Sequence, residues 1–159
     1  MPRVHFVKKA RKANKEAGIE KGDSYYWWKF RYGGKRVSKT RPKQSQLTQS
    51  EFLSSMYGLQ EEYASLSADN LEDAESTAER LGDMANEVRE IGEECSSKAD
   101  NMESAFPGGS PTMELLRERA DACETIAGEL EDEQSELESA IQEKDVDSLS
   151  FGNVGWDFS

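Results

Sequence analysis

The sequence predicts an α+β protein, in which a small antiparallel β-sheet head of two or three strands, covered by a helix, precedes a long antiparallel α-helical hairpin of the coiled-coil type. Two patterns predict these parts: an aromatic run that ends in Gly-Gly, and heptad repeats on both sides of a Pro-Gly-Gly break. We therefore divide the 159 residues into a basic aromatic head (1–66), an acidic helical hairpin (67–144) and an acidic aromatic tail (145–159).

The clearest element of the head is a β-hairpin. Residues 25–32 (YYWWKFRY) and 35–40 (KRVSKT) flank Gly33-Gly34, and a glycine pair of this kind is typical of a two-residue type I′ turn. Residues 3–8 can add a third strand. Such a turn places Arg31 opposite Arg36, where like charges destabilise a strand pair unless an anion lies nearby. One aromatic face is expected to be core under the first helix, and it comprises Tyr26, Trp28, Phe30 and Val37.

A capping box predicts where the first helix begins. Thr48 is expected as the N-cap, with Glu51 three residues later. The apolar stripe that follows has helical spacing and is the expected cover of the sheet; it comprises Phe52, Met56, Leu59, Tyr63 and Leu66. The stripe loses its phase before Leu71, so a break is expected at residues 67–70.

A strict three-four repeat runs from Leu71 to Phe106, and a second runs from Met113 to Ile141. Between them, Pro107-Gly-Gly should end one helix, and Ser110 with Pro111 should begin the next. If the chain folds back at this turn, the residue numbers of every facing pair of stripe positions add up to 218 or 219. This register places Cys95 opposite Cys123 and Gly92 opposite Ala127. A dimer or a larger bundle built on the same apolar seam is an alternative to the hairpin, because further apolar side chains lie beside the stripes and need a cover. These are Met84, Ile91, Leu115 and Ile126.

Residues suited to catalysis are scarce. His5 is the single histidine, and it lies in an expected strand without a nucleophile beside it. The two cysteines are far apart and have no Cys or His cluster around them. We therefore expect no enzyme, no cofactor and no metal site. No apolar run approaches membrane-spanning length, so we expect no membrane association.

Charge is divided sharply along the chain. Residues 1–44 hold fourteen Lys/Arg and three acidic residues, a net charge of +11, while the remainder holds six basic and 29 acidic residues, a net charge of −23. Interleaved lysines, arginines and aromatics are suited to phosphates and bases. The candidate nucleic-acid-binding residues are Lys8, Lys9, Arg11, Lys12, Tyr25, Trp27, Lys29, Arg31, Lys35, Arg36, Lys39 and Arg41.

The tail has no basic residue beyond residue 145 and is expected to be dispensable for folding of the helical hairpin. We expect it either to dock on the head as an extended strand or to be a disordered segment. In the second case it would present Phe151, Trp156 and Phe158 to a protein partner.

The segment GDSYYWWKFRYGGKRVSKT resembles the strand pairs in arm-type DNA-binding domains of phage integrases, which combine a three-stranded sheet with a helix. This resemblance covers residues 1–66, and no recombinase catalytic domain follows. The whole chain resembles small accessory proteins of tailed phages and prophages, which implies no activity. Because the sequence has no apolar run of membrane-spanning length and the N-terminus lacks the apolar stretch of a signal peptide, we expect the protein in the cytoplasm of the host cell.

Three functions fit these observations. The leading hypothesis is a phage or mobile-element accessory protein that binds DNA or RNA through its head and a host or phage protein through its helical hairpin. The second is an anti-defence inhibitor, in which the acidic hairpin mimics nucleic acid and acts as a decoy for a host nucleic-acid-handling complex. The third is a structural or assembly component of a phage.

Overall fold

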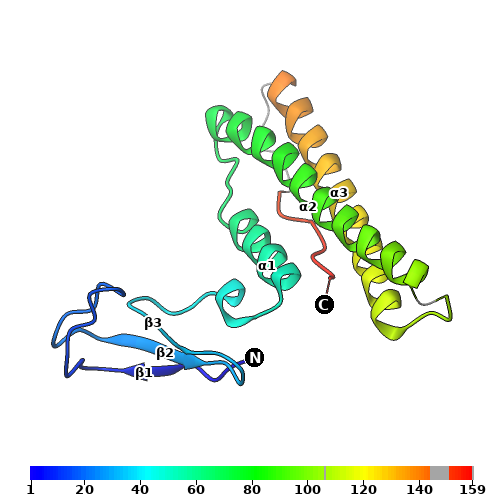
Figure 1. Cartoon of the computed structure of the whole chain (residues 1–159). Coiled ribbons are helices and arrows are strands. Elements are labelled where there is room, and N and C mark those ends of the chain that lie inside the picture. Colours follow the sequence, from blue (N-terminus) through cyan, green and yellow to red (C-terminus); the bar gives the residue numbers. More distant parts are fainter. Residues whose placement is uncertain (106, 144–150, 159) are drawn as a thin grey trace. The chain divides into compact units, whose positions relative to one another are not determined.

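The computed structural model describes residues 1–105, 107–143 and 151–158 (Figure 1). A small antiparallel sheet and long helices confirm the α+β class. The chain divides into two compact units, which we call the sheet unit (residues 1–58) and the helical unit (residues 59–159). The boundary lies within helix α1 (Glu51–Tyr63), so it comes earlier than the boundary at residue 66 suggested by the sequence.

The sheet contains three antiparallel strands in the order β1 (His5–Val7), β2 (Tyr25–Lys29) and β3 (Lys35–Ser38). The third strand predicted from residues 3–8 is thus confirmed as β1. The long connection between β1 and β2 is ordered by backbone hydrogen bonds. Among these, Ala10 N–H donates to the Asp23 carbonyl at 2.7 Å, and Ala10 itself is buried.

The predicted two-residue turn is wrong. Lys29 pairs with Lys35, so five residues connect β2 to β3. Neither Gly33 nor Gly34 has the positive φ that a type I′ turn needs. The physical reason is tertiary packing: Phe30 is buried at 7% exposure, and a Cβ on Gly33 would lie 3.1 Å from the Gln49 amide nitrogen. Burial of an aromatic ring therefore outweighs the preference of the glycine pair for a tight turn.

The changed register alters which residues face one another. Arg36 pairs with Trp28 rather than with Arg31, which lies in the connection. Val37 pairs with Trp27. Val37 therefore lies on the opposite face of the sheet from Trp28, because successive side chains in a strand alternate.

Helix α1 begins later than predicted. Ser50 is its N-cap, because the Ser50 hydroxyl accepts a hydrogen bond from Leu53 N–H at 3.4 Å. Thr48 instead accepts a hydrogen bond from Ser50 N–H at 3.1 Å. The capping box predicted at Thr48 is wrong because the preceding residues form a short 3₁₀-helix, η1 (Gln44–Leu47), which delays the start.

The expected break between helices is confirmed, and it is longer than residues 67–70. Helix α1 ends at Tyr63, and α2 (Leu71–Ala105) begins after Asn70. Asn70 caps α2 by accepting a hydrogen bond from Asp73 N–H at 3.0 Å.

Helices α2 and α3 (Pro111–Glu143) pack as the predicted hairpin (Figure 1). Ser110 caps α3 and Pro111 is its first residue, both as predicted. Phe106 lies outside the described residues. The predicted stripes supply most of the core; its fully buried side chains include Ala74, Leu81, Val88, Ala99, Cys123, Ala127, Leu130 and Leu137. Met84 and Ile126, beside the stripes, are buried too, whereas Leu115 is 43% exposed.

Helices α2 and α3 approach each other closely at Gly92. A Cβ on Gly92 would lie 2.8 Å from the Cys123 Cβ, so its nearest neighbour is Cys123 rather than the predicted Ala127. The difference is one helical turn along α3. Small side chains permit this close contact.

Cys95 and Cys123 are both buried free thiols. Burial raises the pKa of both, and for Cys123, where the charge of Cys95 adds to the effect, the pKa rises to about 11. Because the thiolate is the reactive form, we expect mild oxidation to be slow at pH 7 and to accelerate as the pH rises toward 11.

The expected product of this oxidation is a disulfide within one chain, seen as a faster band on a non-reducing gel. A Cys95→Ser variant is the control and should give no such band. A crosslink that forms only between chains would contradict the placement of the two cysteines on facing helices of one hairpin.

Residues 151–158 pack within the helical unit. Gly152 N–H and Asn153 N–H both donate to the Glu133 carboxylate at 2.8 Å, and the Tyr63 hydroxyl donates to the same carboxylate at 2.5 Å. Glu133 is 6% exposed. Burial raises the pKa of Tyr63 well above its usual range.

Both expectations for the tail are therefore wrong where the structure describes it. Phe151 and Trp156 contact the Tyr63 ring, and Phe158 is buried at 6% exposure. The aromatics pack inward because Tyr63, at the end of α1, gives them an apolar surface. The expectation for residues 145–150 lies outside the described residues.

Candidate nucleic-acid interface

One face of the sheet centres on Trp27. The His5 ring stacks on it with a centroid separation of 4.2 Å and an interplanar angle of 9°. The Lys35 ammonium lies 4.5 Å from the Trp27 ring centroid. His5 and Lys35 come from the strands on opposite sides of β2, so they cover opposite faces of the indole. Trp27 consequently presents its edge, and no free stacking face, to a ligand.

The opposite face of the sheet contributes to the core of the head. Trp28 is 3% exposed, and Phe30, in the following connection, is 7% exposed, so both are buried as predicted. Tyr63 was expected to help cover the sheet, which is wrong, because it packs on Phe151, Trp156 and Glu133. Tyr26 is only half-buried. Its ring centroid lies 4.9 Å from that of the exposed Phe6 ring.

The structure distributes the candidate residues over several surfaces. Tyr25, Trp27, Lys29 and Lys35 share one face of the sheet, whereas Arg36 lies on the other. Arg31 is in the β2–β3 connection, and Lys39 and Arg41 follow β3. The remaining candidates, Lys8, Lys9, Arg11 and Lys12, are exposed in the connection after β1.

Lys29 and Lys35 form a directly opposed pair of like charges across β2 and β3. Such a pair destabilises the strands unless an anion lies between the ammonium groups. This pair takes the place of the Arg31 and Arg36 pair expected from sequence. A phosphate bound beside this pair would lessen the repulsion.

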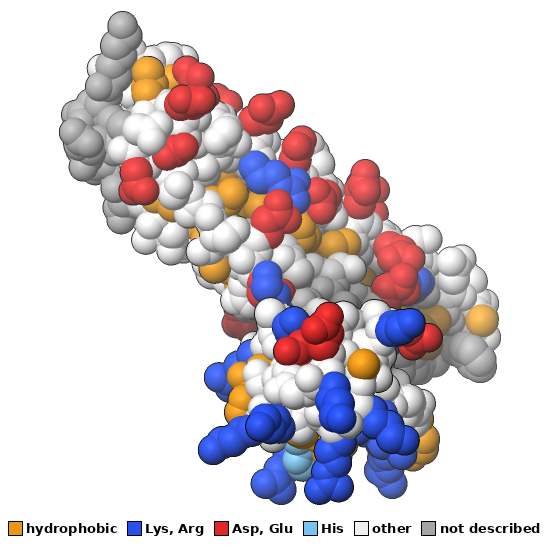
Figure 2. Space-filling view, turned by 90° about the vertical axis from the view of Figure 1, so that its left-hand side faces the viewer, with side chains coloured by type: hydrophobic (Ala, Val, Ile, Leu, Met, Phe, Trp, Pro, Cys, Tyr) orange, Lys and Arg blue, Asp and Glu red, His pale blue; other side chains and the backbone are white. Residues whose placement is uncertain are grey.

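The basic residues of the head have few internal counter-ions. In the parts of the chain that the structure describes, residues 1–44 form one ion pair, between Lys39 and Asp23 at 2.9 Å, and its hydrogen bond lowers the pKa of Asp23. By contrast, the helical unit pairs most of its cations with carboxylates, namely Arg80, Arg89, Lys98 and Arg117. Figure 2 shows Lys and Arg side chains gathered over the sheet unit and acidic side chains over the helices.

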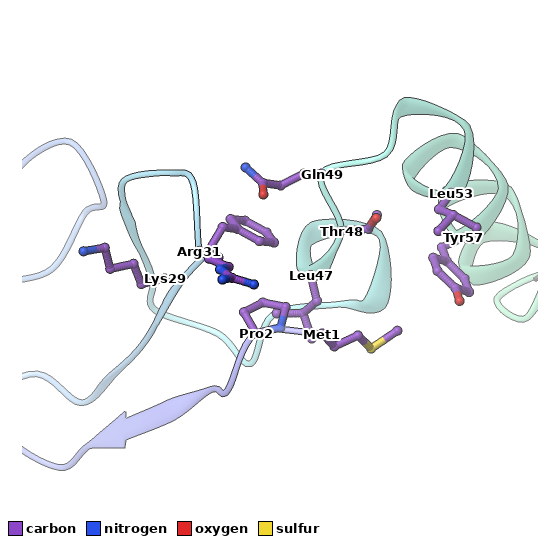
Figure 3. Close-up of a pocket in the computed structure, with 10 residues that line it drawn as sticks. Met1, Pro2, Lys29, Arg31, Leu47, Thr48, Gln49, Leu53 and Tyr57 are labelled. Atoms are coloured by element: carbon purple, nitrogen blue, oxygen red, sulfur yellow. The ribbon is translucent and has the colours of Figure 1, made fainter. Parts of the chain in front are cut away.

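A hollow of about 620 Å³ lies in the head beside the β2–β3 connection (Figure 3). Lys29 and Arg31 line it from the sheet side, and Leu53 and Tyr57 line it from α1. Its other lining residues are Met1, Pro2, Phe30, Leu47, Thr48 and Gln49. Sequence reasoning missed this hollow, because it joins segments far apart in the chain; the one signal was Leu47, an apolar residue just before the helix.

Comparisons with protein-family models, curated proteins and solved structures find no match to this chain. Among the described residues, no helix is both long enough and apolar enough to cross a membrane. The same residues contain no group of three His, Cys, Asp or Glu side chains placed to hold a metal ion.

Proposed function

We propose that this chain is a phage or mobile-element accessory protein that binds nucleic acid through its head and a protein partner through its acidic helical hairpin. The observation that carries the proposal is the opposed pair Lys29 and Lys35, set among basic residues of which, in the described part of residues 1–44, Lys39 alone forms an ion pair. A folded chain tolerates such repulsion at small cost, and a polyanion relieves it.

The physical basis of binding is the release of counter-ions from phosphates by lysine and arginine. The exposed cations of the head have long, solvated side chains, which suit phosphates better than base edges. Little sequence preference is therefore expected, together with a steep loss of affinity as the salt concentration rises.

A salt titration with the variant Lys29→Glu/Lys35→Glu tests this function. On a duplex, each neutralised phosphate adds about 0.9 to the steepness with which log affinity falls against log salt. The variant should neutralise about two fewer phosphates than the wild type, so its plot should be shallower by about twice that amount. Fluorescence anisotropy with a labelled duplex measures both slopes.

Lys98→Glu is the matched control, because it reverses a charge in the helical unit. It should leave the slope unchanged. A wild-type affinity that stays constant between about 50 and 200 mM salt would refute phosphate binding by the head.

A second candidate, the anti-defence decoy, is favoured by the net charge of −23 on residues 45–159. In that case the chain would compete with DNA for a basic groove of a host nucleic-acid-handling complex. If excess DNA fails to displace the chain from the host complex, the acidic hairpin does not mimic nucleic acid.

A further inference from the structure

A nucleic-acid base needs an apolar surface, and the sheet offers little of it. Both faces of Trp27 are covered, and Trp28 and Phe30 are buried. Tyr32 is 83% exposed, but the Arg31 guanidinium lies over its ring at 5.4 Å from the centroid. Besides the exposed Phe6 ring on β1, the hollow beside the β2–β3 connection is an apolar surface next to the cations.

The hollow has the size of a small-molecule site and is open to solvent. Its volume of about 620 Å³ is within the range common for such sites, roughly 300–1,000 Å³. Leu47, Leu53 and Tyr57 supply apolar walls, and Thr48 and Gln49 supply groups that can hydrogen-bond a base edge. This combination suits a flat, polar-edged ring.

The charges beside the hollow suit phosphates. Lys29 and Arg31 are both exposed, and no Asp or Glu is among the described residues that line the hollow. Lys29 also shares the Trp27 face of the sheet with Lys35. Lys29 therefore belongs both to this face of the sheet and to the lining of the hollow. In Figure 3, Arg31 lies on the sheet side of the hollow, across from Leu53 and Tyr57.

We propose that the hollow takes one unstacked base of a single strand, while Lys29 and Arg31 hold the flanking phosphates. The inference rests on the proposed function and deepens it, because it names single-stranded nucleic acid as the substrate class. Bases of a duplex are stacked and paired, and their extrusion costs a few kcal/mol. We expect the chain to bind a single strand at least about tenfold more tightly than a duplex of the same length.

The test measures anisotropy of labelled single-stranded and duplex oligonucleotides with the full chain at one salt concentration. Leu53→Trp fills the hollow and should bring single-strand affinity down to the duplex level, a loss of about tenfold, with duplex affinity unchanged. Leu53→Ala removes a wall without adding bulk and should also weaken single-strand binding alone, which covers the case in which the larger side chain disturbs folding.

Arg31→Gln and Arg41→Gln form a matched pair, since each removes one exposed arginine from the head. Arg31→Gln should reduce single-strand affinity several-fold more than Arg41→Gln does. Equal losses in the two variants would show a general effect of charge and would overturn the assignment of Arg31.

The outcomes separate this inference from the proposed function. Equal affinity for single strands and duplexes, or a loss confined to Tyr32→Ala, overturns the hollow as a base site and leaves nucleic-acid binding in place. A mononucleotide that competes as well as the strand overturns strand recognition in favour of a free nucleotide. Failure to bind either oligonucleotide at low salt refutes the proposed function itself.

Discussion

Replacement of Glu133 by alanine is expected to lower the free energy of unfolding by about 2–4 kcal/mol. The Glu133 carboxylate accepts three hydrogen bonds, from Tyr63, Gly152 and Asn153. Its removal leaves these donors without that acceptor in a site where Glu133 is 6% exposed. Each unsatisfied buried donor costs about 1–3 kcal/mol. The total cost is limited because the tail can detach, so that its N–H groups bind water instead.

Thermal unfolding and amide hydrogen exchange measure this effect. We expect a lower melting temperature, together with faster exchange at Gly152 and Asn153. Glu136→Ala is the matched control, because Glu136 is an exposed residue on the same helix, and it should change stability by less than about 0.5 kcal/mol. If Glu133→Ala unfolds at the wild-type temperature, the tail contributes nothing to the helical unit.

Gly92→Leu is expected to cost about 3 kcal/mol or more. The added Cβ would lie 2.8 Å from the Cys123 Cβ, and neither atom can rotate away because both are fixed to helix backbones. Helices α2 and α3 must then separate, which loosens the buried seam on both sides. Leucine is a good helix former, so the loss cannot come from helix propensity.

Urea unfolding of Gly92→Leu beside Gly128→Ala separates packing from propensity. A Cβ on Gly128 meets nothing within 4 Å, so this control should raise stability by up to about 1 kcal/mol. The two substitutions should therefore change the free energy of unfolding in opposite directions, although both glycines lie in the same hairpin. Wild-type stability in Gly92→Leu would show that the helices do not approach closely there.

The helical hairpin was predictable because its information is local and repeated. The heptad pattern, the Ser110 cap and Pro111 are all read along the chain, and the structure agrees with them. The β-hairpin register was not predictable, since burial of Phe30 and contact with Gln49 decide it. These contacts join segments that no periodicity connects.

The candidate site is predictable in composition but not in arrangement. The sequence shows that the head is rich in cations, but it predicts Arg31 opposite Arg36, whereas the pair that faces across the strands is Lys29 and Lys35. The sequence suggests that Trp27 offers a stacking face, whereas His5 and Lys35 cover it. The hollow depends on α1 meeting the β2–β3 connection, a tertiary contact without a signature in the sequence.

The site around Glu133 also has a consequence for how the chain folds during synthesis. The partners of Glu133 are Tyr63, Gly152 and Asn153, and Val154 N–H donates to the Tyr63 hydroxyl, 91 positions earlier in the chain. Translation adds about 5–20 residues per second from the N-terminus. Residues 151–158 are therefore made about one to three seconds after the end of α3, and the Glu133 site closes only once they are available to it. Until then the Tyr63 ring lacks the aromatic contacts that Phe151 and Trp156 give it in the folded chain.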